Sequence, residues 1–262
     1  MTTWGWMAAG YGGCMAVIAL ARGTRMRVRP AAAAVLFAVV SAAASTVHAW
    51  SAQVWVPGAV ALGGYWLSGL FIGAPQPWLE ARLLQSDRRL FERLRLDEAL
   101  RAAPAWVLEC LEFCYSTVYL VVMAGAVGVA TIDRQAVAAY WAIVLPAEFL
   151  CYLALPFLRS RPPRSLEAAG VIAVRAPRMR RLNDAIVGRG SIQVNTIPSG
   201  HVAGALAAGL AVLPWSAGVG ATLIVIAVLI AIAATVGRYH YAIDCLLGAG
   251  VAIAVWLVAG MG

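Results

Sequence analysis

Two histidines in the C-terminal part of the chain stand in settings that favour chemistry on a phosphate group. The first, His201, closes the string Pro198-Ser199-Gly200-His201, and an apolar run follows it directly. Free amide groups at a helix N-terminus, together with the helix dipole, form a ready binding site for an anion. An imidazole in the first turn of that helix would lie beside a phosphate held there. The string therefore predicts an anion-binding helix start with an acid–base group next to it.

The second histidine, His240, is followed four residues later by Asp244 in the string GRYHYAIDCLLG. Residues four apart share a helix face, so this carboxylate can orient the imidazole and stabilise its cationic form. An aspartate inside a membrane span costs about 2.5–3.5 kcal/mol on insertion scales, so it should have a partner or a task. The alternative interpretation is a structural pair, in which the two side chains only meet each other's hydrogen-bonding needs.

A third motif, LRSRPPR at residues 158–164, gathers three arginines at the expected end of an apolar run. Guanidinium groups are planar, permanently charged forks that suit phosphate oxygens. Arginines that flank a span are also common topology anchors, so this cluster alone is weak evidence. Our candidate phosphate-binding residues are Arg161, Arg164, Ser199, Gly200 and Arg238.

The composition shows which elements must position these residues. The chain of 262 residues is 62% hydrophobic and 12% charged, against roughly 45–50% and 25% in soluble proteins. A water-soluble fold is therefore excluded, and the sequence predicts an all-α, polytopic membrane helix bundle of about eight transmembrane helices. The expected spans are residues 4–21, 31–50, 54–73, 106–130, 137–158, 199–214, 218–236 and 240–260.

Two polar stretches separate these spans. Between Pro75 and Pro104, leucines recur near helical spacing among mixed charges, which predicts an amphipathic interfacial helix. That helix could be a solvated linker or could gate the substrate. The stretch 159–197 holds eight arginines and three prolines, and we expect a loop there. With the spans above, parity places all three motifs at one face of the membrane.

These motifs resemble the type 2 phosphatidic acid phosphatase superfamily, and their spacing is most similar to the branch that includes inositol phosphorylceramide synthases. The resemblance covers roughly residues 54–260, and its specific part is the Pro-Ser-Gly-His string with His-x-x-x-Asp. It implies that His240 is the nucleophile, that Asp244 orients it, and that His201 is the general acid for the leaving group. It further implies that Ser199 and Gly200 bind phosphate oxygens.

Two positions depart from the superfamily's commonest pattern. Ala154 stands where the first motif usually has a lysine, and Ala234 stands where the third motif usually has an arginine. The synthase-like branch has an altered first motif and a His-Tyr-x-x-Asp third motif, as this chain does. We expect a single membrane domain, 1–262, in which residues 1–53 add N-terminal helices to a phosphatase-like core at 54–262.

The expected function is hydrolysis of a lipid phosphate monoester or diphosphate, such as phosphatidate or a prenyl phosphate, through a phosphohistidine intermediate. Two alternatives stay open: a phosphotransferase that moves a phospho-head group to an acceptor alcohol, and a non-enzymatic lipid transporter. Phosphoryl transfer depends mainly on positioning and charge stabilisation, so arginines and helix amides can replace magnesium. We therefore expect no metal and no other cofactor.

The net charge of +8 comes entirely from arginine, and basic loops beside spans attract anionic lipid head groups. The expected partners are the bilayer and a phosphate-bearing membrane lipid. Nucleic acid is not expected because the chain has no separate basic domain, and the oligomeric state stays open. We expect a multi-pass protein of a bacterial inner membrane. The positive-inside rule applied to residues 22–29 makes the site cytoplasmic, whereas the resemblance implies an outward or lumenal site.

Three further acids lie in apolar runs, namely Glu109, Glu112 and Glu148. Each could line an acceptor or head-group pocket. Each could equally be buried between helices with hydrogen-bonded partners.

Overall fold

The computed structural model describes residues 1–21, 28–167, 171–175, 177–194 and 196–260, and the regular structure in these ranges is entirely helical. This confirms the expected all-α class. The N-terminal helices are α1 (Thr3–Ala21), α2 (Val28–Ala44), α3 (Trp50–Gly69), α4 (Pro77–Arg93), α5 (Leu96–Ala102), α6 (Ala105–Ser116), α7 (Val118–Ile132) and α8 (Ala136–Ala154). They are followed by a 3₁₀ turn (Pro163–Ser165), α9 (Val171–Arg175), α10 (Arg178–Gly190), α11 (Gly200–Val212), α12 (Ala217–Val236) and α13 (Ala242–Gly260).

Helices α1, α8, α12 and α13 are long and apolar enough to cross a membrane. The pair α6–α7 forms a fifth candidate span, bent by 59° at Thr117. Helices α2 and α11 are apolar but shorter. By length and composition the described residues thus contain four or five candidate spans, although each of the eight predicted segments corresponds to a helix or to this bent pair.

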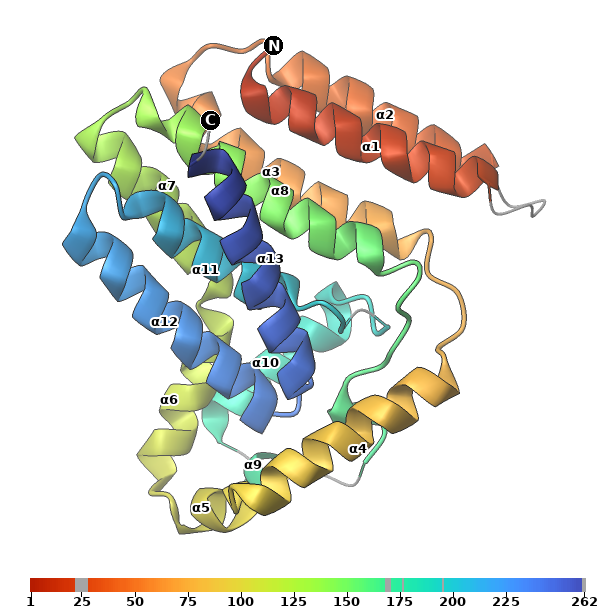
Figure 1. The fold of residues 1–262 in the computed structure, drawn as a ribbon, viewed down its shortest axis with the longest axis vertical. Coiled ribbons are helices and arrows are strands. Elements are labelled where there is room, and N and C mark those ends of the chain that lie inside the picture. The colour runs from red at the N-terminus through yellow and green to blue at the C-terminus, as the bar shows by residue number, and fades with distance from the viewer. Residues whose placement is uncertain (22–27, 168–170, 176, 195, 261–262) are drawn as a thin grey trace.

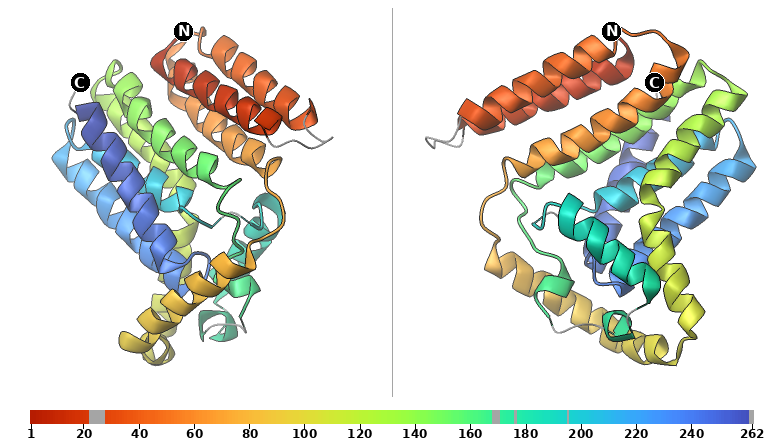
Figure 2. Two further views of the ribbon diagram at one scale, coloured as in Figure 1. Left: turned by 45° about the vertical axis from the view of Figure 1, so that its right-hand side comes forward. Right: turned by 180° about the vertical axis from the view of Figure 1, so that it is seen from behind.

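Helix α11 is the centre of the bundle and packs against α7, α8, α12 and α13 (Figure 1). Nearly all of its residues are buried, and most of them are alanine or glycine. Small side chains let neighbouring helix backbones approach closely. The helix that carries His201 is therefore held on all sides. The hairpin of α1 and α2 lies to one side of this centre and contacts α3 and α8 (Figure 2).

The amphipathic helix predicted between Pro75 and Pro104 is present as α4, which starts at Pro77 and runs along the edge of the bundle opposite the α1–α2 hairpin (Figure 1). A break at Leu94 and Arg95 separates α4 from α5, so the stretch forms two helices and not one. The stretch 159–197 was expected to be a loop, and this was wrong, because it contains α9 and α10. The buried residues of α10 are polar, Arg180 and Asn183. A search for apolar runs could not detect a helix whose buried face is polar. Residues 22–27 of the predicted cytoplasmic loop lie outside the described residues.

Candidate active site

The two motif histidines lie next to each other, with ring centroids 5.6 Å apart. His201 stands in the first turn of α11, and His240 lies in the turn between α12 and α13. His240 is buried, with 4% of its surface exposed. Both side chains line the same cavity of about 260 Å³. A single anion can therefore contact both rings.

The surroundings of His240 define which ring nitrogen is free to react. Its Nδ1 lies 2.9 Å from the carbonyl oxygen of Thr196 and 3.5 Å from Oδ2 of Asp244. Because a carbonyl oxygen can only accept a hydrogen bond, Nδ1 carries the hydrogen and donates it. Nε2 then keeps its lone pair, as a nucleophile requires. The fully buried Asp244 is itself held by the amide of Tyr241, which donates to Oδ2 over 3.0 Å.

The two histidine motifs are joined through the backbone. The amide of Ser199 donates to the carbonyl oxygen of Asp244 over 3.0 Å. One turn further along α13, a Cβ on Gly248 would lie only 2.3 Å from the carbonyl oxygen of Ser199, so this glycine permits the close approach. The Ser199 hydroxyl caps α11 by accepting from the amide of Val202. Gly200 lines the cavity beside both histidines.

A column of stacked rings supports His201. Its imidazole stacks on Tyr115 with a centroid distance of 5.4 Å, and Tyr115 stacks on Tyr239 at 3.9 Å. The Tyr239 hydroxyl donates to Oε2 of Glu112 over 2.6 Å. Because Tyr239 precedes His240, this column links the two catalytic candidates through side chains as well as backbone.

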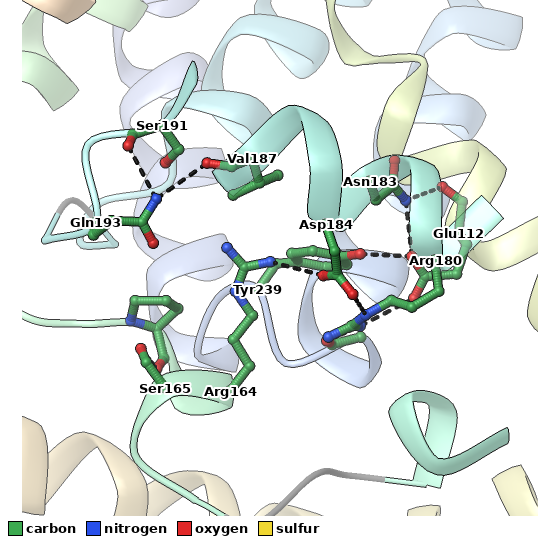
Figure 3. Close-up of polar contacts among 12 residues, drawn as sticks. Glu112, Arg164, Ser165, Arg180, Asn183, Asp184, Val187, Ser191, Gln193 and Tyr239 are labelled. Carbon is green, nitrogen blue, oxygen red and sulfur yellow. Dashed lines mark hydrogen bonds and ion pairs between the residues drawn. The ribbon is translucent and has the colours of Figure 1, made fainter. Parts of the chain in front are cut away.

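Glu112 is the centre of a buried polar cluster between α6, α10 and the α12–α13 turn (Figure 3). Its carboxylate pairs with Arg180 and accepts from the amide nitrogen of Asn183 over 2.8 Å. Arg180 also donates to the carbonyl oxygen of Gly237 over 2.7 Å. Glu112 is thus buried with hydrogen-bonded partners, the second of the two alternatives above. Glu109 accepts from the first amides of α10, those of Arg178 and Met179.

The three candidate arginines lie outside the lining of the histidine cavity and contact carboxylates. Arg161 makes a two-pronged ion pair with Glu80 of α4, with both nitrogen–oxygen distances at 2.9 Å. Arg238 pairs with Asp87 of α4 at 2.7 Å and also with Glu167. Arg164 lies 3.6 Å from Asp184 and covers the ring of Tyr239 (Figure 3). The structure thus groups His201, His240, Asp244, Ser199 and Gly200, and sets these arginines apart.

Sequence reasoning missed the acids of α4 that hold these arginines. Glu80 and Asp87 are seven residues apart, hence on one helix face, and this spacing was a usable signal. Hydrogen bonds from Arg161 lower the pKa of Glu80 below its usual value. Burial raises the pKa of Asp87 to about 6, which the Ala242 amide and Arg238 only partly oppose. Both acids tie α4 to the motif segments.

The cavity that holds the histidines is walled mainly by apolar side chains of α3 and α7. Its polar lining includes Tyr65, Tyr119, Tyr152 and Glu148 in addition to the histidines. An apolar cavity with convergent polar groups at one place is typical of a small-molecule site.

Comparison with curated proteins and with solved structures gave no match. The family model of the PAP2 superfamily matches residues 81–258, which is more than half of the chain and includes all three motifs. The match does not distinguish the inositol phosphorylceramide synthase-like branch. It supports a phosphatase- or phosphotransferase-type activity on lipid phosphoesters, and the long apolar helices agree with an integral membrane protein. The chain therefore belongs to the PAP2 superfamily, the type 2 phosphatidic acid phosphatases that its motifs resemble.

Proposed function

We propose that this protein is a lipid-phosphate phosphatase that cleaves a phosphate monoester or diphosphate through a phosphohistidine on His240. One observation carries the proposal: two imidazoles, 5.6 Å apart, share an apolar cavity, and one of them has its Nδ1 held by a carbonyl oxygen. We propose a bacterial inner membrane as its location, and the long apolar helices support the membrane setting.

The reaction has two steps. In the first, Nε2 of His240 attacks phosphorus, the phosphorus–oxygen bond to the lipid breaks, and protonated His201 gives its proton to the departing oxygen. In the second, water attacks phosphorus, His201 takes a proton from that water, and the nitrogen–phosphorus bond breaks to release phosphate. Asp244 stabilises the imidazolium form of His240 in both steps. His201, His240 and Asp244 thus account for the proton transfers and for the charge on the nucleophile in both steps.

The phosphate oxygens have two classes of candidate ligand. The amide of Gly200 belongs to the first turn of α11, where backbone donors and the helix dipole favour an anion. Arg161, Arg164 and Arg238 would bind phosphate by exchanging a carboxylate oxyanion for a phosphate oxyanion, since each contacts an acid in the structure. No step in this scheme uses a metal ion.

Transfer to a lipid alcohol is the second candidate function. A second cavity of about 260 Å³, between α3, the α6–α7 bend and α10, also reaches His201. It shares Leu62, Tyr65, Val118, Tyr119 and His201 with the first cavity. Two cavities that meet at the acid–base residue could hold a donor lipid and an acceptor alcohol, in which case the alcohol would replace water in the second step.

The deciding experiment measures release of inorganic phosphate from a panel of lipid phosphates by purified protein in EDTA. We expect activity in the wild type and a loss of about a hundredfold or more in His201→Ala and His240→Ala. The third histidine, His48, is exposed and remote in sequence, so His48→Ala is the matched control and should keep full activity.

The outcomes separate the rival functions. Loss of wild-type activity in EDTA would overturn the metal-independent mechanism, and full activity in both motif variants would remove the site assignment. Lipid movement that survives His240→Ala, without phosphate release from the wild type, would identify a transporter. With a lipid whose phosphate is labelled, label found on an added alcohol rather than in free phosphate would favour the transferase.

A further inference from the structure

Glu148 of α8 is a buried carboxyl group that the proposed mechanism does not use. Its exposed fraction is 8%, and its Oε2 atom is fully buried without a hydrogen-bond partner. Within the part of the chain that the structure describes, it forms no ion pair. It nevertheless lines the cavity that contains both histidines.

The position of Glu148 follows from close packing between α8 and α11. Gly200 and Gly204, four residues apart, form the α11 face that meets α8. A Cβ on Gly204 would lie 2.4 Å from Oε1 of Glu148, and one on Gly200 would lie 3.0 Å from Tyr152. The carboxyl group therefore lies against α11 about one turn from His201, within the same cavity.

Other buried acids show that this arrangement is unusual for the molecule. Glu80, Asp87 and Glu112 each contact an arginine. Asp244 contacts His240 and a backbone amide through Oδ2, although its Oδ1 also has no partner. Burying a carboxyl group without a donor is costly, so a group left in this state calls for a donor from elsewhere. The cavity that it lines is where a substrate would supply one.

We infer that Glu148 accepts a hydrogen bond from a hydroxyl group of the lipid substrate, and so selects lipid phosphates that carry a free hydroxyl near the phosphate. The inference rests on the proposed function. A hydroxyl group needs only one acceptor, which Glu148 supplies, and the rest of the lining is mainly apolar. The apolar walls of α3 and α7 then take the hydrocarbon chain.

The test compares two substrates that differ only in this hydroxyl: a short-chain lysophosphatidate and its 2-deoxy analogue, presented in the same detergent micelles. Phosphate release gives kcat/KM for each. We expect the wild type to prefer the hydroxyl-bearing lipid about tenfold or more, since a site built to bind a hydroxyl rejects an analogue that lacks it. Glu148→Met should bring the ratio close to one by lowering activity on the hydroxyl-bearing lipid alone.

Two further variants distinguish a loss of hydroxyl recognition from a general loss of folded protein. Glu148→Gln retains an acceptor oxygen and should keep most of the preference. Gly204→Ala retains the carboxyl group but displaces it, and should reduce the preference. A wild-type ratio near one, or an equal loss on both substrates in Glu148→Met, would overturn the inference. No phosphate release from either lipid by the wild type would instead count against the proposed function itself.

Discussion

Buried carboxyl groups have partners at the α4 edge of the bundle but not in the histidine cavity beside α8. On α4, Glu80 and Asp87 each pair with an arginine from a motif segment. In the cavity, Glu148 meets no cation in the described part of the chain. A carboxylate that stabilises the fold contacts a cation of the same chain, whereas a carboxyl group that binds a ligand has no partner until the ligand is present. The difference separates structural acids from a recognition group.

The ion pairs Glu80–Arg161 and Asp87–Arg238, together called the paired region, join α4 to the motif loops. This region also explains how the motif loops keep their shape. The Tyr241 hydroxyl donates to the carbonyl oxygen of Arg161, and the Arg164 amide donates to that of Arg238. Arg238 has a φ of 61°, in the left-handed region, where a residue without a glycine's freedom needs support from its surroundings. Its ion pairs with Asp87 and Glu167 supply that support and hold the turn that presents His240.

The largest effect should come from breaking the paired region at Arg238. Arg238→Ala leaves the buried Asp87 without its cation, and we expect a loss of about 3–5 kcal/mol in the free energy of unfolding. Unfolding by denaturant in detergent measures this loss. Arg89→Ala, on the exposed side of α4, is the control and should change little. A loss below about 1 kcal/mol would mean that the pair does not stabilise the fold.

A smaller effect of opposite sign should follow from removing the unpaired acid. Glu148→Met replaces a buried carboxyl group with an apolar side chain of similar length, and should leave stability unchanged or raise it by about 1 kcal/mol. The same unfolding assay on the ligand-free protein measures it. Destabilisation as large as that of Arg238→Ala would erase the distinction between the two regions.

The smallest effect concerns pH and the Glu80–Arg161 pair. Because the pKa of Glu80 is lowered in the folded protein, its stabilisation is fully present above the unfolded value near 4.5 and is lost as the pH falls through the lower folded value. Arg161 has a side chain that is 43% exposed, so solvent screening limits the effect to below about 1 kcal/mol. Thermal unfolding from pH 6 to pH 3 should show the wild type lose its advantage over Glu80→Gln. A constant difference across that range would contradict the assignment.

Much of the architecture could be read from local patterns. Apolar runs located α1, α2, α3, α8, α11, α12, α13 and the bent pair α6–α7, and the amphipathic spacing after Pro75 located α4. The motif strings at His201 and His240 predicted a catalytic site, because an imidazole at a helix start and an aspartate one turn after a histidine can be recognised from the local sequence alone. Such features depend only on residues close together in the chain.

Other features depend on which distant residues meet. Three features involve contacts between residues far apart in sequence: the bend at Thr117, the polar buried face of α10, and the pairing of each motif arginine with an acid of another segment. The same holds for Glu148, which looked no different from Glu112 in the sequence. Hydropathy places an acid inside a helix bundle, but only packing decides whether an arginine lies beside it or a cavity does.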